Sequence, residues 1–71
     1  MTKAETIAKG LGFRERKAIM NARGDADRGY WFKPGTARGV PQELKVRSID
    51  GHYLSETGLE VRALLKGQDH G

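Results

Sequence analysis

Apolar residues recur at helical spacing over the first part of the chain. They fall at positions i, i+3, i+4 and i+7, the stripe that an amphipathic helix turns toward a core. The stripe consists of Ala4, Ile7, Ala8 and Leu11. Gly10 and Gly12 lie at its end, and glycine is the usual residue just past a helix. The pattern predicts a first helix over residues 2–11.

A second helix is predicted to run from about Phe13 to Arg23. Its inward side would consist of Ile19, Ala22 and either Phe13 or Ala18. Outside that stripe lie three cations, which are Arg14, Arg16 and Lys17. Gly24 is a natural stop for this helix.

The segment from Gly24 to Val40 shows no regular pattern. It is rich in glycine and carries the aromatic run Tyr30-Trp31-Phe32. Aromatic residues favour strands and packed anchors, so the run predicts a short strand or an anchor packed on the helices. Because so small a chain needs its single tryptophan inside, Trp31 is expected in the core.

Pro41 predicts a third helix, over residues 41–48. Proline suits the first helical position because its missing N–H would have no partner there. Leu44 is the clearest inward residue of this segment, whereas Lys45 and Arg47 face outward.

Asp50-Gly51 is the strongest turn signal in the chain and predicts a hairpin with a two-residue loop. The flanking residues 48–49 and 52–54 would form its short strands. Ser55 then predicts the N-cap of a last helix, with a rival start at Thr57.

The inward face of this last helix is predicted to consist of Val61, Leu64 and Leu65. Gly58 would let the helix approach a neighbour closely. One core is predicted from the large aliphatic residues of all the elements: Ile7, Leu11, Ile19, Leu44, Leu54, Leu64 and Leu65. Residues 67–71 are predicted to be a disordered polar tail.

Length and composition limit the class of protein. A chain of 71 residues is one small domain at most, predicted here over residues 1–66. No cysteine is present, which excludes disulfides and thiolate metal sites and favours a reducing, cytoplasmic location. The apolar runs are three residues long, far below the roughly 18 needed to cross a bilayer. We therefore expect neither a membrane span nor a signal peptide.

The sequence offers no convincing catalytic, cofactor or metal site. Gly10-Leu11-Gly12 lacks the third glycine of a dinucleotide fingerprint and follows a helix rather than a strand. His52 and His70 are far apart in the chain and have no nearby partner of ligand type. We therefore expect no enzyme, no cofactor, no metal ion and no small-molecule substrate.

Two features suggest binding instead. The net charge is +4, from 13 basic and 9 acidic residues, which suits a polyanion partner as well as a solvated mixed-charge surface. The basic residues concentrate over the second predicted helix and residues 33–47: Arg14, Arg16, Lys17, Arg23, Lys33, Arg38, Lys45 and Arg47. The second feature is Trp31 with Lys33 near it, since a base could stack on an exposed tryptophan.

Residues 54–65, together with the order of the elements before them, resemble the winged helix-turn-helix family. In that family a wing strand gives Leu-Ser/Thr-x-x-Gly and runs into a helix with valine and paired leucines, as Leu54, Gly58 and Val61 do here. The resemblance implies an α+β, mainly α fold: a compact winged-helix-like domain with three to four helices and a short β-hairpin. The chain also resembles small uncharacterised proteins of phage type.

The winged-helix resemblance implies a small nucleic-acid-binding regulator or accessory factor with double-stranded DNA as its partner. Helix 41–48 would occupy the recognition position, with Gln42, Lys45 and Arg47 facing the major groove and Arg38 near a phosphate. The alternative is a phage-type interaction module or inhibitor that binds a host protein. Its contacts would come from the basic face and from Tyr30, Trp31 and Lys33.

Overall fold

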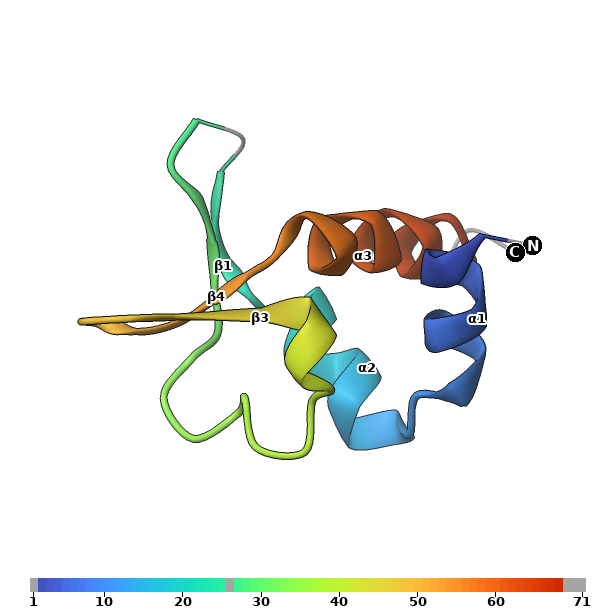
Figure 1. Ribbon diagram of the computed structural model, residues 1–71, viewed down its shortest axis with the longest axis horizontal. Helices are drawn as coiled ribbons and strands as arrows, with labels where there is room; N and C mark the ends of the chain where they lie inside the picture. The colour runs from blue at the N-terminus through green and yellow to red at the C-terminus, as the bar shows by residue number, and fades with distance from the viewer. Residues whose placement is uncertain (1, 26, 69–71) are drawn as a thin grey trace.

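The computed structural model describes residues 2–25 and 27–68, with the side chain of Gln68 excepted. Over these residues the chain forms three α-helices, one short 3-10 helix and a four-stranded antiparallel sheet (Figure 1). In chain order the elements are α1 (Lys3–Gly10), α2 (Phe13–Met20), β1 (Arg23–Asp25), β2 (Gly29–Trp31), η1 (Gln42–Leu44), β3 (Lys45–Ser48), β4 (Gly51–Leu54) and α3 (Glu56–Gln68). The α+β class expected from the sequence is confirmed.

The first two helices begin where the sequence predicts. Thr2 caps α1 in a reciprocal box, in which its side chain accepts from the Glu5 N–H and Glu5 accepts from the Thr2 N–H. These hydrogen bonds hold the pKa of Glu5 below its usual value. α2 ends at Met20, three residues before the predicted end at Arg23, because Arg23 is the first residue of strand β1. Ala18 rather than Phe13 takes the third inward position, and Phe13 is 77% exposed.

The sheet has the strand order β1-β2-β4-β3. Trp31 of β2 pairs with Tyr53 of β4, and Tyr53 also pairs with Val46 of β3. Arg23 of β1 pairs with Trp31 on the other side. Because paired residues share a face and successive residues alternate, these four side chains lie on one face of the sheet. We call this row of Arg23, Trp31, Tyr53 and Val46 the outer face.

The predicted helix 41–48 is wrong. Only Gln42–Leu44 are helical, as one turn of 3-10 helix, and Lys45–Ser48 form strand β3. Residues 45–48 pair one by one with β4, from Lys45 with Leu54 to Ser48 with Gly51. Pairing with β4 satisfies the backbone groups on one side of β3, and those on its other side face outward because β3 is an edge strand.

The hairpin lies where it was predicted, but its loop is shifted by one residue. Ser48 and Gly51 are paired, so Ile49 and Asp50 form the connection. Gly51 carries the positive φ, +134°, and none of the described residues other than glycine has one. The loop therefore lacks the two positive φ angles that the predicted type I′ turn requires.

The core lies between the three helices and η1. Ile19, Leu44 and Val61 are completely buried. All seven aliphatic residues predicted for the core belong to it or pack against it, with Ile7, Leu11 and Leu64 only half-buried. That prediction is confirmed, and small residues such as Ala4 and Ala8 complete the packing between α1 and α3.

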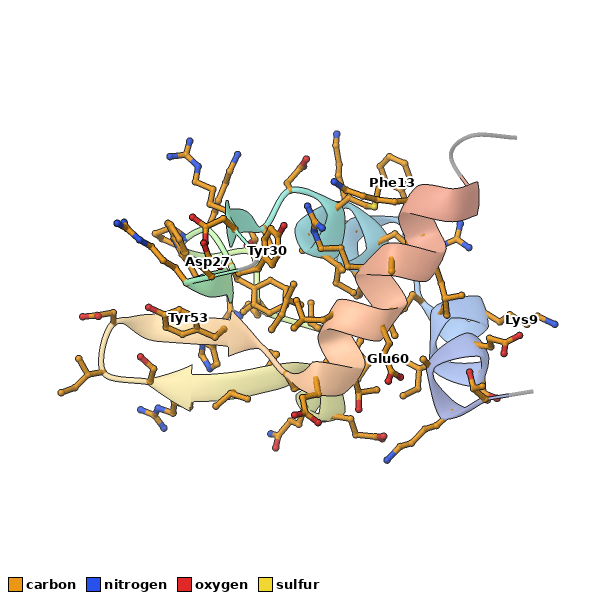
Figure 2. All side chains as sticks on the ribbon, turned by 90° about the horizontal axis from the view of Figure 1, so that it is seen from above. Lys9, Phe13, Asp27, Tyr30, Tyr53 and Glu60 are labelled. Atoms are coloured by element: carbon orange, nitrogen blue, oxygen red, sulfur yellow. The ribbon has the colours of Figure 1, made fainter. Side chains whose placement is uncertain are left out.

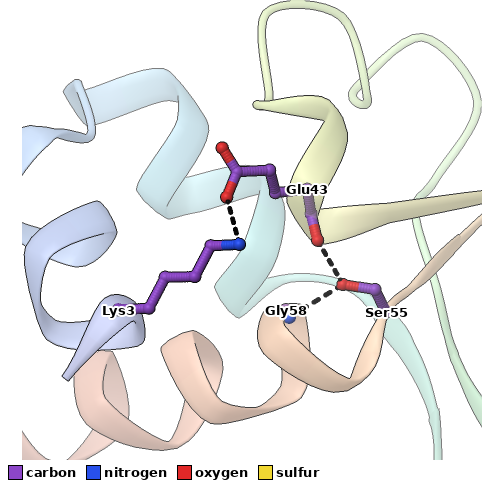
Figure 3. A network of polar contacts seen from close by, with 4 residues as sticks. All are labelled: Lys3, Glu43, Ser55 and Gly58. Carbon is purple, nitrogen blue, oxygen red and sulfur yellow. Dashed lines mark hydrogen bonds and ion pairs between the residues drawn. The ribbon is translucent and has the colours of Figure 1, made fainter.

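The start of α3 is fixed by Ser55, as predicted. Its hydroxyl accepts from the Gly58 N–H at 3.0 Å and donates to the Glu43 carbonyl at 2.6 Å (Figure 3). A Cβ on Gly58 would lie 2.6 Å from the Leu44 carbonyl oxygen, so the predicted close approach is to η1.

The far end of α3 departs from the prediction. The helix includes residues 67 and 68, which were expected in the tail, and residues 69–71 lie outside the described part. No helix within the described ranges is long and apolar enough to span a membrane.

Candidate nucleic-acid interface

Three of the four residues predicted to contact DNA come together, although on a 3-10 turn and a strand rather than on one α-helix. Gln42, Lys45 and Arg47 line one surface hollow together with His52. Gln42 comes from η1, and Arg47 pairs with His52 across the β3–β4 hairpin. We call these four residues the hairpin hollow. Each of its side chains can donate a hydrogen bond, and no carboxylate lines it.

Lys45 has a structural as well as an electrostatic part in the hairpin hollow. Its ammonium donates to the Ala37 carbonyl at 3.1 Å, and its side chain is half-buried. This bond ties the 33–40 loop to the edge strand and holds the charge at a fixed place. Gln42 and Arg47 are exposed and free to reach a ligand. Together they suit the oxygens of a phosphate, which a guanidinium binds in a bidentate manner.

Glu43 does not enter the hairpin hollow. Its carboxylate pairs with the Lys3 ammonium of α1 at 3.1 Å (Figure 3). Both side chains are largely exposed, so this pair contributes at most about 1 kcal/mol to stability. The main consequence of this ion pair is that the one acidic side chain of η1 points toward α1 and away from the hairpin hollow.

Arg38 is not part of the hairpin hollow. It lines a separate depression between α2 and the 35–39 turn, with Arg14 and Lys17 beside it. Phe13 forms another wall of this depression, and the Lys17 ammonium lies 5.5 Å from the centre of its ring. The predicted DNA contacts are therefore divided between two places.

The expectation that Trp31 lies in the core is wrong. Trp31 is 39% exposed, whereas its neighbour Phe32 is buried and supplies the aromatic anchor. The reason is the alternation of side chains along β2, which places successive residues on opposite faces. The predicted short strand itself is confirmed by Gly29–Trp31.

The other two residues of the predicted partner site are less available. Tyr30 faces α3, where the Arg62 guanidinium lies over its ring at 4.0 Å. The Nε of Arg62 is buried without a hydrogen-bond partner in the described structure. Lys33 is half-buried and lines a hollow that also contains Trp31, Asp50 and His52.

Sequence reasoning missed His52 and Tyr53 as site residues. Tyr53 places its ring centre 6.5 Å from that of Trp31, with the two planes tilted by 55°. The signal was available, because side chains alternate on both sides of the Asp50-Gly51 turn. Continuing β3 back from that turn would have placed Val46 and Tyr53 on one face and Arg47 and His52 on the other.

Comparisons with protein-family models, curated proteins and solved structures give no match to this chain. In the described ranges, no group of three histidine, aspartate or glutamate side chains lies close enough to hold a metal ion.

Proposed function

We propose that this protein is a small nucleic-acid-binding regulator or accessory factor of winged-helix type. In this proposal the β3–β4 hairpin acts as the wing and makes the contacts that the resemblance assigned to a helix. The observation that carries it is the convergence of Gln42, Lys45, Arg47 and His52 in one hollow without a carboxylate.

The arrangement suits a phosphate backbone better than base edges. Arg47 and Gln42 are exposed on the edge strand and the adjoining turn, while Lys45 is held by Ala37 and contributes mainly its charge. Contacts to phosphates position a protein on nucleic acid and make its affinity depend on salt. The excess of four positive charges over the whole chain acts in the same direction.

The test is binding of random-sequence double-stranded DNA between about 50 and 200 mM salt. Replacing Arg47 by alanine is expected to weaken binding and to flatten the slope of log K against log salt by about 0.9. Lys66→Ala on α3 removes an exposed cation far from the hairpin and is the matched control. Arg62 is unsuitable as a control because it packs on Tyr30. Equal slopes for wild type and Arg47→Ala would refute the proposed site.

A further inference from the structure

The outer face of the sheet carries an aromatic pair, an exposed Trp31 and a half-buried Tyr53, that the hairpin hollow does not use. Trp31 and Tyr53 lie on β2 and β4, the two central strands, and pair directly across them. Val46 extends this row onto β3 and is 51% exposed. The described helices and loops therefore leave an aromatic and aliphatic strip accessible to solvent.

On β3 and β4 this strip lies on the opposite face from the hairpin hollow, although His52 also lines the hollow that contains Trp31 and Lys33. Val46 and Arg47 are consecutive residues of β3, so their side chains lie on opposite faces of the strand. The same alternation separates Tyr53 from His52 on β4. Figure 2 shows Tyr53 over the hairpin and Phe13 far away on α2.

The aromatic pair forms a small hollow rather than a closed stack. The hollow is lined by Trp31, Asp50 and Tyr53. The rings are tilted by 55° with their centres 6.5 Å apart, so neither ring covers the other completely. A planar ligand can therefore stack on one ring and meet the other at its edge, the geometry that aromatic groups prefer.

We infer that this strip binds unpaired bases of a single-stranded nucleic acid. Aromatic side chains on the face of an antiparallel sheet stack bases that have left a duplex, and they do so with little sequence preference. Trp31 and Tyr53 are the stacking residues. The inference rests on the proposed binding of nucleic acid. It adds that the nucleic acid is single-stranded and that it contacts a second face of the protein.

Two cations that can meet phosphates lie around the strip, and two carboxylates oppose them. Arg23 is the cross-strand partner of Trp31, and Lys33 lines the hollow on the other side of that ring. Asp50 is one opposing charge, because it lines both hollows that contain Trp31, and Asp25 is another, because it shares a face of β1 with Arg23. The carboxylate of Asp25 accepts from the backbone N–H groups of Asp27 and Arg28 in the β1–β2 turn.

The single tryptophan makes the inference directly measurable. Titration with oligothymidine is expected to quench the fluorescence of Trp31 and to saturate, while the matched duplex quenches it less. Anisotropy of a labelled oligothymidine then compares the variants. Tyr53→Leu keeps an apolar side chain but removes the ring, and it should weaken binding about 5- to 150-fold, the loss expected for one stacked base.

Two further variants serve as controls of aromaticity and charge. Phe13→Leu removes an aromatic side chain that is more exposed than Trp31 but lies off the sheet, and it should leave affinity unchanged. Asp50→Asn removes the carboxylate beside the rings and should tighten binding, by up to about 5-fold for an exposed charge. Circular dichroism confirms that each variant is folded.

The outcomes separate this inference from the proposed function. Binding of duplex with unchanged Trp31 fluorescence and an undiminished affinity of Tyr53→Leu would overturn the stacking platform and leave the hairpin hollow in place. Quenching by oligothymidine, together with duplex binding whose affinity and salt slope Arg47→Ala does not alter, would support the platform and refute the hollow. Quenching by a cationic peptide, weakened in Asp50→Asn, would also overturn the inference, because it would identify a protein ligand.

Discussion

The helical side of this molecule and the outer face of its sheet use large side chains in opposite ways. Between the helices, Ile19, Leu44 and Val61 are completely buried and small residues bring the backbones close together. On the sheet, by contrast, Trp31 and Val46 face solvent although the chain has few large apolar residues to spare. Burial of such residues is the main source of stability in a small domain. Their exposure on the outer face is the observation from which we infer that this face binds a ligand.

The largest expected effect lies in the buried side of this comparison. Leu44 is completely enclosed, whereas Ile49 in the hairpin loop is fully exposed. Leu44→Ala should lower the free energy of unfolding by about 2–5 kcal/mol, because it removes buried methyl groups and leaves a cavity. Ile49→Ala should change it by no more than about 0.5 kcal/mol. Urea denaturation measures both, and similar losses would contradict the division between the two regions.

The two regions also differ in how far local sequence predicted them. α1 and α3 each carry a periodic apolar stripe and a hydroxyl cap, so both could be located without knowledge of their neighbours. Strand β1 consists of Arg23, Gly24 and Asp25, all exposed, and has no apolar pattern to find. Its pairing depends on Gly24, where a Cβ would clash with the Gly29 carbonyl oxygen.

The segment after Pro41 shows why the candidate site was placed on the wrong element. A proline with polar residues and one leucine behind it fits a helix start, and the 3-10 turn at Gln42–Leu44 satisfies that signal. The conformation of residues 45–48 is decided instead by pairing with residues 51–54, which lie beyond the turn. The predicted site residues nevertheless line one hollow, because η1 runs directly into β3 and Gln42, Lys45 and Arg47 lie close to that junction.

A smaller effect is expected where α3 meets η1. Alanine normally stabilises a helix by about 0.5–1 kcal/mol relative to glycine. At Gly58 the new Cβ would lie 2.6 Å from the Leu44 carbonyl oxygen, so Gly58→Ala should instead destabilise by about 1–3 kcal/mol. Gly67, in the same helix, has nothing within 4 Å, and Gly67→Ala should be stabilising. Urea midpoints that move in the same direction for both would contradict the close packing of α3 on η1.

The smallest effect concerns the hydroxyl that joins the sheet to the last helix. Ser55→Ala leaves the Gly58 N–H and the Glu43 carbonyl without their side-chain partner, and should cost about 1 kcal/mol. Ser55→Thr keeps the hydroxyl and should retain most of that stability. Thr57→Ala removes the rival cap and should change stability by less than about 0.5 kcal/mol. A Thr57→Ala loss as large as that of Ser55→Ala in urea denaturation would move the start of α3. Ser55 directly follows β4 and its hydroxyl bonds to the Glu43 carbonyl of η1. That result would therefore also mean that this bond does not hold the hairpin against the helical side.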